Sequence, residues 1–134
     1  MSIDVHIVDG ALRASMALPP QNLCGALVCF EGRVRPDEEG REIQGLDYQT
    51  YDPMAEMELR RLALEAMNRF GAKAFSVEHS RGFVAVGEVS FRLRIASAHR
   101  KESLAAVEWF IDQMKSDVPI WKSPVFAGER ETVR

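Results

Sequence analysis

The sequence predicts an α+β fold with a largely antiparallel sheet, and three observations support it. Residues 88–97, EVSFRLRIAS, alternate strictly between apolar and polar side chains, which is the pattern of a strand. Strand-like and helix-like segments are mixed along the chain, which favours this fold over a doubly wound parallel sheet. The chain has 134 residues, of which 46% are hydrophobic. This is enough for one core, so we expect residues 1–134 to form a single domain.

Three extended segments are expected before the first helix. Ile3, Val5 and Ile7 alternate with polar residues and predict a short first strand. The segment GALVCFEGRVR, from Gly25 to Arg35, predicts a second strand whose internal glycine indicates a bulge or the close approach of another backbone. After the polar turn PDEEG, residues Ile43 to Tyr51 are expected to be extended again.

A first helix is expected to begin at Asp52-Pro53, because Asp can cap a helix and Pro suits its first position. Gly71 is placed to end it after Phe70. Apolar residues at helical spacing predict its buried stripe: Ala55, Leu59, Leu62, Ala63, Ala66 and Phe70.

The second half is expected to add two strands and a helix. A strand from about Ala74 to His79 leads through a glycine-punctuated connection, residues 81–88, into the alternating strand described above. A helix from about Lys101 to Asp117 should follow and stop before Pro119. Its expected buried residues are Leu104, Val107, Ile111 and Met114.

Composition excludes several classes of protein. A net charge of -3 argues against a general nucleic-acid binder. The N-terminus lacks the pattern of a signal peptide, and no apolar run approaches the roughly 20 residues that cross a bilayer, so we expect a soluble, cytoplasmic protein without a membrane partner. Cys24 and Cys29 lack the spacing of a zinc site and are interpreted as buried thiols. Cys29 stays open as a persulfide carrier because basic residues lie near it.

The chemistry of the chain is expected to depend on cationic side chains, since the P-loop, GxGxxG, HExxH and GxSxG patterns are all absent. At the junction SAHRKE an anion would meet a helix start together with His99 and Arg100, although solvated charges give the same pattern. Lys115 lies at the border of an apolar helix face. There it is either a partly desolvated nucleophile or base, or an ordinary surface lysine. Trp121, beside Lys122, is expected to fill the core.

Three blocks, GALVCFEGRVR, SAHR and MKSDVPIWK, occur in this order, and over most of its length the chain resembles the molybdopterin synthase large subunit family. The resemblance implies an α/β-hammerhead-like fold with additional antiparallel strands. It also implies an enzyme that converts cyclic pyranopterin monophosphate to molybdopterin by inserting two dithiolene sulfurs, in molybdenum cofactor biosynthesis. A small ubiquitin-like carrier would bring the sulfur as a C-terminal thiocarboxylate, so no cofactor and no metal are expected. A homodimer with one carrier at each end, a heterotetramer, is implied as well.

The resemblance also assigns roles to individual residues. Lys115 and Lys122 match the family's two essential lysines. The residues that match its substrate-binding positions are Arg35, His99, Arg100 and Phe30, of which Phe30 is expected to be a pocket wall. The His99-Arg100 pair is expected to act across the dimer interface. The tail departs from the family, because Glu131 follows Arg130 where an aromatic residue is common.

Two other functions remain open. A non-catalytic module could hold a pterin phosphate or a carrier tail in the same cationic pocket. An acid-base enzyme acting on another phosphorylated metabolite would need no protein partner. Dependence of turnover on the carrier separates these possibilities from the synthase.

Overall fold

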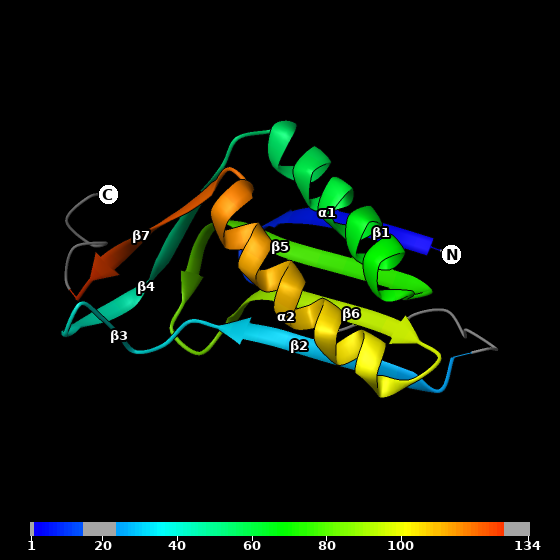
Figure 1. Ribbon diagram of the computed structural model, residues 1–134. Coiled ribbons are helices and arrows are strands. Elements are labelled where there is room, and N and C mark those ends of the chain that lie inside the picture. Colours follow the sequence, from blue (N-terminus) through cyan, green and yellow to red (C-terminus); the bar gives the residue numbers. More distant parts are fainter. Residues whose placement is uncertain (1, 15–23, 128–134) are drawn as a thin grey trace.

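A computed structural model describes residues 2–14 and 24–127 (Figure 1). Two helices and a seven-stranded sheet are formed by these residues, which confirms the predicted α+β, hammerhead-like fold with additional antiparallel strands. The helices are α1 (Met54–Phe70) and α2 (Arg100–Asp117). The strands are β1 (Ser2–Asp9), β2 (Ala26–Arg33), β3 (Asp37–Glu38), β4 (Arg41–Thr50), β5 (Ala74–Ala85), β6 (Val89–Ser97) and β7 (Ile120–Phe126).

The strand order is β2-β6-β5-β4-β3, with β1 paired to β5 and β7 paired to β4. All pairs are antiparallel except β1 with β5. Strand β5 belongs to two parts of the sheet: its first half pairs with β1 and β6, whereas residues 82–85 pair with β4. Both helices cover the part formed by β1, β5, β6 and β2, and β4 and β7 extend beyond it (Figure 1).

The expected connection at residues 81–88 is wrong, because β5 continues to Ala85. Gly82, with φ +89°, allows the strand to pass from one part of the sheet to the other. Val84 is then fully buried in a second small core with Val34, Ile43 and Leu46. Burial of this apolar side chain explains why the segment forms a strand instead of a loop. The turn into β6 is limited to residues 86–88.

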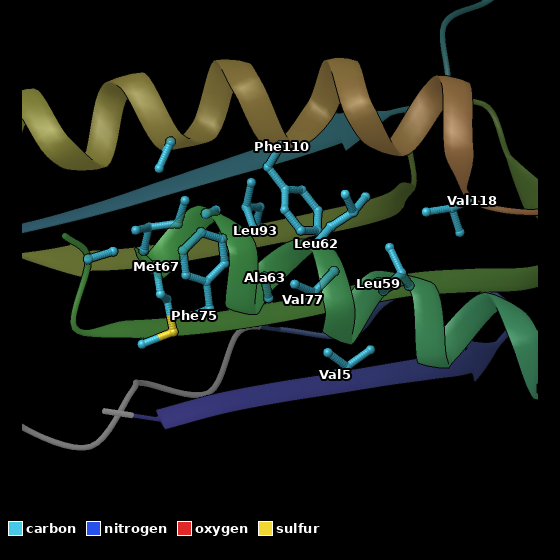
Figure 2. Close-up of a cluster of buried hydrophobic side chains, with 14 of the residues drawn as sticks. Val5, Leu59, Leu62, Ala63, Met67, Phe75, Val77, Leu93, Phe110 and Val118 are labelled. Carbon is cyan, nitrogen blue, oxygen red and sulfur yellow. The ribbon is translucent and has the colours of Figure 1, made fainter. Parts of the chain in front are cut away.

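The main core lies between the two helices and the sheet (Figure 2). The predicted stripe of α1 is buried except at its end, where Phe70 is half-buried against the ring of Trp109. Gly71 ends the helix in the left-handed conformation as expected, and its N–H donates to the carbonyl of Met67 at 2.9 Å. Leu59, Leu62, Phe75 and Phe110 are among the largest fully buried side chains.

The start of α1 differs from the prediction. Pro53 occupies the N-cap position, and no side chain of the described residues caps the helix by a hydrogen bond. Asp52 instead accepts hydrogen bonds from Thr50, at 3.1 Å, and from Arg81. The Asp52 carboxylate is therefore hydrogen-bonded to side chains of β4 and β5 and does not cap the helix backbone.

The buried face of α2 is rotated by one residue from the predicted face. Ser103, Ala106 and Phe110 are buried, whereas Leu104 is 54% exposed. The hydroxyl of Ser103 donates to the carbonyl of Ile95 at 3.2 Å, so this polar residue is satisfied against the sheet. Small side chains bring the helix close to β6, and the predicted Val107, Ile111 and Met114 only border the core.

The internal glycine of the second predicted strand behaves as expected. The pairing of β2 with β6 shifts register between Gly32 and Arg33, which is the predicted bulge. At the start of β2, a Cβ added to Gly25 would lie 2.7 Å from the carbonyl oxygen of Ala98, so another backbone does approach there.

The polar residues of β6 are buried as well as the apolar ones. Arg92 is 2% exposed and donates to Glu31 at 2.8 Å and to Glu78 at 3.1 Å. A buried guanidinium is tolerated because both carboxylates satisfy it. The hydrogen bond from Arg92 has the largest effect on the pKa of Glu31 and holds that pKa below its ordinary value.

This lowered pKa predicts how stability depends on pH. Because the carboxylate of Glu31 is favoured in the folded state, its contribution is present above the ordinary carboxyl pKa, 4.5, and is lost as pH falls through the lowered folded value. Glu31→Gln should therefore flatten the acid side of the curve of unfolding free energy against pH. Urea denaturation from neutral pH to about pH 3 measures this. Glu108→Gln, at an exposed position of α2, is the matched control and should keep the wild-type slope.

Candidate active site

A cavity of about 700 Å³ lies where the last turn of α2 meets β7 and the ends of β2, β5 and β6. It is positioned by the sheet topology, because β7 pairs with β4 and β4 pairs with the second half of β5. Strand β3 and the segment after β2 close one side of it. Residues from seven elements or their ends therefore face one space.

Four of the six residues predicted for the site line this cavity: Phe30, Arg35, Lys115 and Lys122. Lys115 is in the last turn of α2, and Lys122 is on β7, where it pairs with Tyr48 of β4. Between the two lysines the chain is anchored by Val118, which is buried in the core. The carbonyl of Pro119 accepts a hydrogen bond from the N–H of Tyr51 at 3.1 Å. Helix and strand thus bring both amines to the same cavity.

His99 and Arg100 do not line the cavity. They stand at the opposite end of α2, and with a rise of 1.5 Å per residue about 23 Å of helix separates Arg100 from Lys115. Both side chains are exposed. Within one chain they cannot touch a small ligand that also touches Lys115.

The charges around the cavity are partly balanced. Glu38 of β3 forms ion pairs with both Arg35, at 3.7 Å, and Lys122, at 3.8 Å. Lys115 forms no ion pair with any residue in the described part of the chain. It is also exposed, so in the single chain its surroundings match the surface lysine, and not the partly desolvated amine, of the two alternatives. No other described residue therefore occupies the amine of Lys115 through an ion pair.

The floor of the cavity is uncharged and was not predicted. Tyr48, His79, Ser90 and Phe91 form it. The hydroxyl of Tyr48 donates to Ser90 at 2.9 Å, and burial raises the pKa of Tyr48. Burial lowers the pKa of His79, against the opposing effect of its bond to the Ser80 carbonyl, so its imidazole is neutral at neutral pH. These residues come from three strands, β4, β5 and β6, that only strand pairing brings together.

The predictions that Trp121 fills the core and that the two cysteines are buried are both wrong. Trp121 does not fill the core: it is 57% exposed at the edge of the cavity, on strand β7. Cys29 is exposed and Cys24 is half-buried, so neither is the buried thiol that was expected. Strand β2 is an edge strand, which leaves Cys29 uncovered. Cys29 does not line the cavity, so it is not placed beside the two lysines.

Other site features were also sought. No group of three or more His, Cys, Asp or Glu residues that could hold a metal ion occurs in residues 2–14 and 24–127. None of the helices in those ranges is long and apolar enough to cross a membrane. Arg130 and Glu131, at which the tail departs from the family pattern, lie outside the described residues.

The fold and the cavity define an α+β protein in which two lysines and two arginines, Arg33 and Arg35, line one cavity. The model of the family described as "MoaE protein" matches residues 5–117, which is most of the chain. The chain therefore belongs to the MoaE family. Lys115 falls inside the matched range, and Lys122 lies just beyond it.

Curated relatives carry the name "Molybdopterin synthase catalytic subunit". The human protein is 40% identical over 104 residues, 78% of this chain and 55% of its own length. The protein of Pyrococcus abyssi is 34% identical over 117 residues, 87% of this chain and 79% of its own length. The chain spans about half the length of the human, rat and bovine relatives.

Solved structures share the fold. A structure described as molybdopterin synthase from Staphylococcus aureus has a TM-score of 0.81 at 27% identity and covers 91% of this chain and 90% of its own. A complex of subunits 1 and 2 of the molybdopterin-converting factor from Helicobacter pylori has a TM-score of 0.69 at 26% identity. The match covers 94% of this chain and 91% of the chain in that complex.

Proposed function

We propose that this chain is the catalytic subunit of a molybdopterin synthase. It would convert cyclic pyranopterin monophosphate to molybdopterin by inserting two dithiolene sulfurs, a step of molybdenum cofactor biosynthesis. The observation that supports this best is the meeting of Lys115 and Lys122, from two different elements, in one cavity with Arg35. The names of the relatives agree with this function.

A small ubiquitin-like protein is the proposed sulfur donor, and its C-terminal thiocarboxylate would enter the cavity. The Helicobacter pylori complex of two subunits supports a partner of this kind. The chain would need no cofactor or metal of its own, because the donor brings the sulfur. We place the reaction in the cytoplasm.

Lys115 is the proposed acceptor or activator of the donor's acyl group. In each transfer the thiocarboxylate sulfur forms a bond to a side-chain carbon of the pterin, while a bond from that carbon to oxygen breaks and the oxygen leaves on the opened phosphate or as water. The bond between that sulfur and the acyl carbon then breaks, and the acyl group passes to the Lys115 amine or to water. An amine that forms no ion pair within the described part of the chain suits this role. Lys122 would stabilise the negative charge that develops on the acyl oxygen, since an ammonium group is well placed to do so.

Arg35 would hold the phosphate of the substrate together with His99 and Arg100. Because about 23 Å of helix separates that pair from Lys115 in one chain, we propose that the pair serves the cavity of a second copy. The active unit would then be a homodimer with one carrier bound to each subunit. Phe30 would form an apolar wall of the cavity, where it lies 6.1 Å from the ring of Phe91.

The test is dithiolene formation from purified chain, cyclic pyranopterin monophosphate and thiocarboxylated carrier, followed by fluorescence of the oxidised product. We expect product only when the carrier is present. Carrier binding without product would mean a docking module, and turnover of the phosphorylated substrate without carrier would mean an unrelated acid-base enzyme. Carrier with an ordinary C-terminal carboxylate is the control and should give no product.

A further inference from the structure

His79 presents an unused hydrogen-bond acceptor to the cavity. It lies on β5, is 5% exposed, and forms part of the cavity floor. Its Nδ1 is 2.8 Å from the carbonyl oxygen of Ser80. A carbonyl only accepts, so Nδ1 carries the hydrogen of the neutral ring, and Nε2 has a lone pair.

The second ring nitrogen has access to the open space of the cavity. Nε2 has no hydrogen-bond partner among residues 2–14 and 24–127. The side-chain polar atoms in these ranges that lack a partner and are also fully buried do not include Nε2. The atom therefore keeps some exposed surface, and the cavity is the space that His79 lines.

Aromatic rings hold the imidazole in this orientation. The ring of Tyr48 meets it edge to face, with centroids 5.2 Å apart, and the ring of Phe91 lies 5.8 Å away. Tyr48 is fixed in turn by its hydrogen bond to Ser90. The acceptor is thus pre-oriented before any ligand arrives, which reduces the entropic cost of using it.

We propose that Nε2 of His79 accepts a hydrogen bond from an N–H group of the ligand that fills the cavity floor. This inference rests on the proposed function, which supplies two ligands with such a group: the pterin ring, and the backbone amides of the carrier tail. A ligand that displaced water from the floor without offering a donor would leave the acceptor unpaired, at a cost in affinity. His79 is therefore a positioning residue that selects ligands with a matching N–H.

Removing the acceptor while keeping a ring is the direct test. His79→Phe should raise the KM of one substrate about tenfold and change kcat by less than about twofold, as expected for the loss of one buried hydrogen bond. A rise in the pterin KM assigns the N–H to the pterin ring, and a rise in the carrier KM assigns it to the tail. Unchanged KM values for both substrates would overturn the proposal.

Two further variants separate positioning from folding. His79→Gln keeps an acceptor of similar reach, so its KM values should return to within about threefold of the wild type. Val77→Ala removes a buried side chain two residues earlier on the same strand and face, but outside the cavity. It should lower the Tm and leave both KM values unchanged.

A measurement without turnover distinguishes failure of this inference from failure of the proposed function. The ring nitrogens of His79 are followed by ¹⁵N NMR while cyclic pyranopterin monophosphate or carrier with an ordinary carboxylate is added. We expect the Nε2 resonance to shift with one of the two ligands. If the wild type makes no product, the proposed function fails, and an Nε2 resonance that neither ligand moves then overturns the role of His79 as well.

Discussion

Lys115→Ala should lower the rate of carrier-dependent product formation by at least about 100-fold, the usual lower bound for loss of a residue that takes part in the chemical step. The reason is positional: Lys115 reaches the cavity from the end of α2, and no ion pair with another described residue engages its amine. Single-turnover kinetics with saturating carrier measures the effect. The fold should remain intact, because the side chain is exposed.

Two companion variants make this result interpretable. Lys73→Ala removes the same charge from an exposed position outside the cavity and should keep the wild-type rate. Lys115→Arg keeps the positive charge but offers no nucleophilic amine. If Lys115→Arg retains a rate within tenfold of the wild type, the residue acts through its charge, and the proposed acyl transfer to Lys115 is wrong.

Gly45→Ala should destabilise the fold by about 3 kcal/mol or more, at the upper end of what overpacking costs. A Cβ at this position on β4 would lie 2.3 Å from the carbonyl oxygen of Val84 and 2.6 Å from the ring of Phe83. The carbonyl belongs to β5 and cannot move without breaking the pairing of β4 with β5. Urea denaturation followed by circular dichroism measures the loss.

Gly32→Ala is the matched control for this prediction. Gly32 is also a strand glycine, but an added Cβ would meet the side chain of Phe91 at 3.5 Å, which is an ordinary contact. Its effect on the free energy of unfolding should stay below about 1 kcal/mol. Equal losses in the two variants would mean that the close approach at Gly45 is not what limits stability.

The sequence predicted the elements well where one physical signal dominated. Alternation identified β6, and the helical stripe with Gly71 identified α1 and its end. The face of α2 was misjudged because Leu104 is more apolar than Ser103, whereas close packing against β6 favours the smaller residue. The length of β5 was missed because Gly82 looks like a break, yet its positive φ keeps the strand in the sheet.

Only those site residues that form a local sequence pattern could be predicted. Lys115 and Lys122 lie close in sequence and matched a known block, and the cavity contains both. Glu38 was read only as part of a polar turn, although it pairs with two of the cations. His79 and Tyr48 have no local pattern that marks them, since they meet only through the pairing of distant strands. Contacts of this kind cannot be predicted from spacing.

The length of the short turn from α2 to β7 sets the positions of the Lys115 and Lys122 amines relative to each other. Val118 is fixed in the core on one side, and the Pro119 carbonyl is tied to Tyr51 on the other, so the turn has no slack to absorb a length change. Since side chains alternate along a strand, one residue inserted here would slip the register of β7 and turn Lys122 to the opposite face. Trp121, which already lies at the edge of the cavity, would move into the position on β7 that Lys122 occupies. Chain length in this turn is thus under tighter constraint than residue identity.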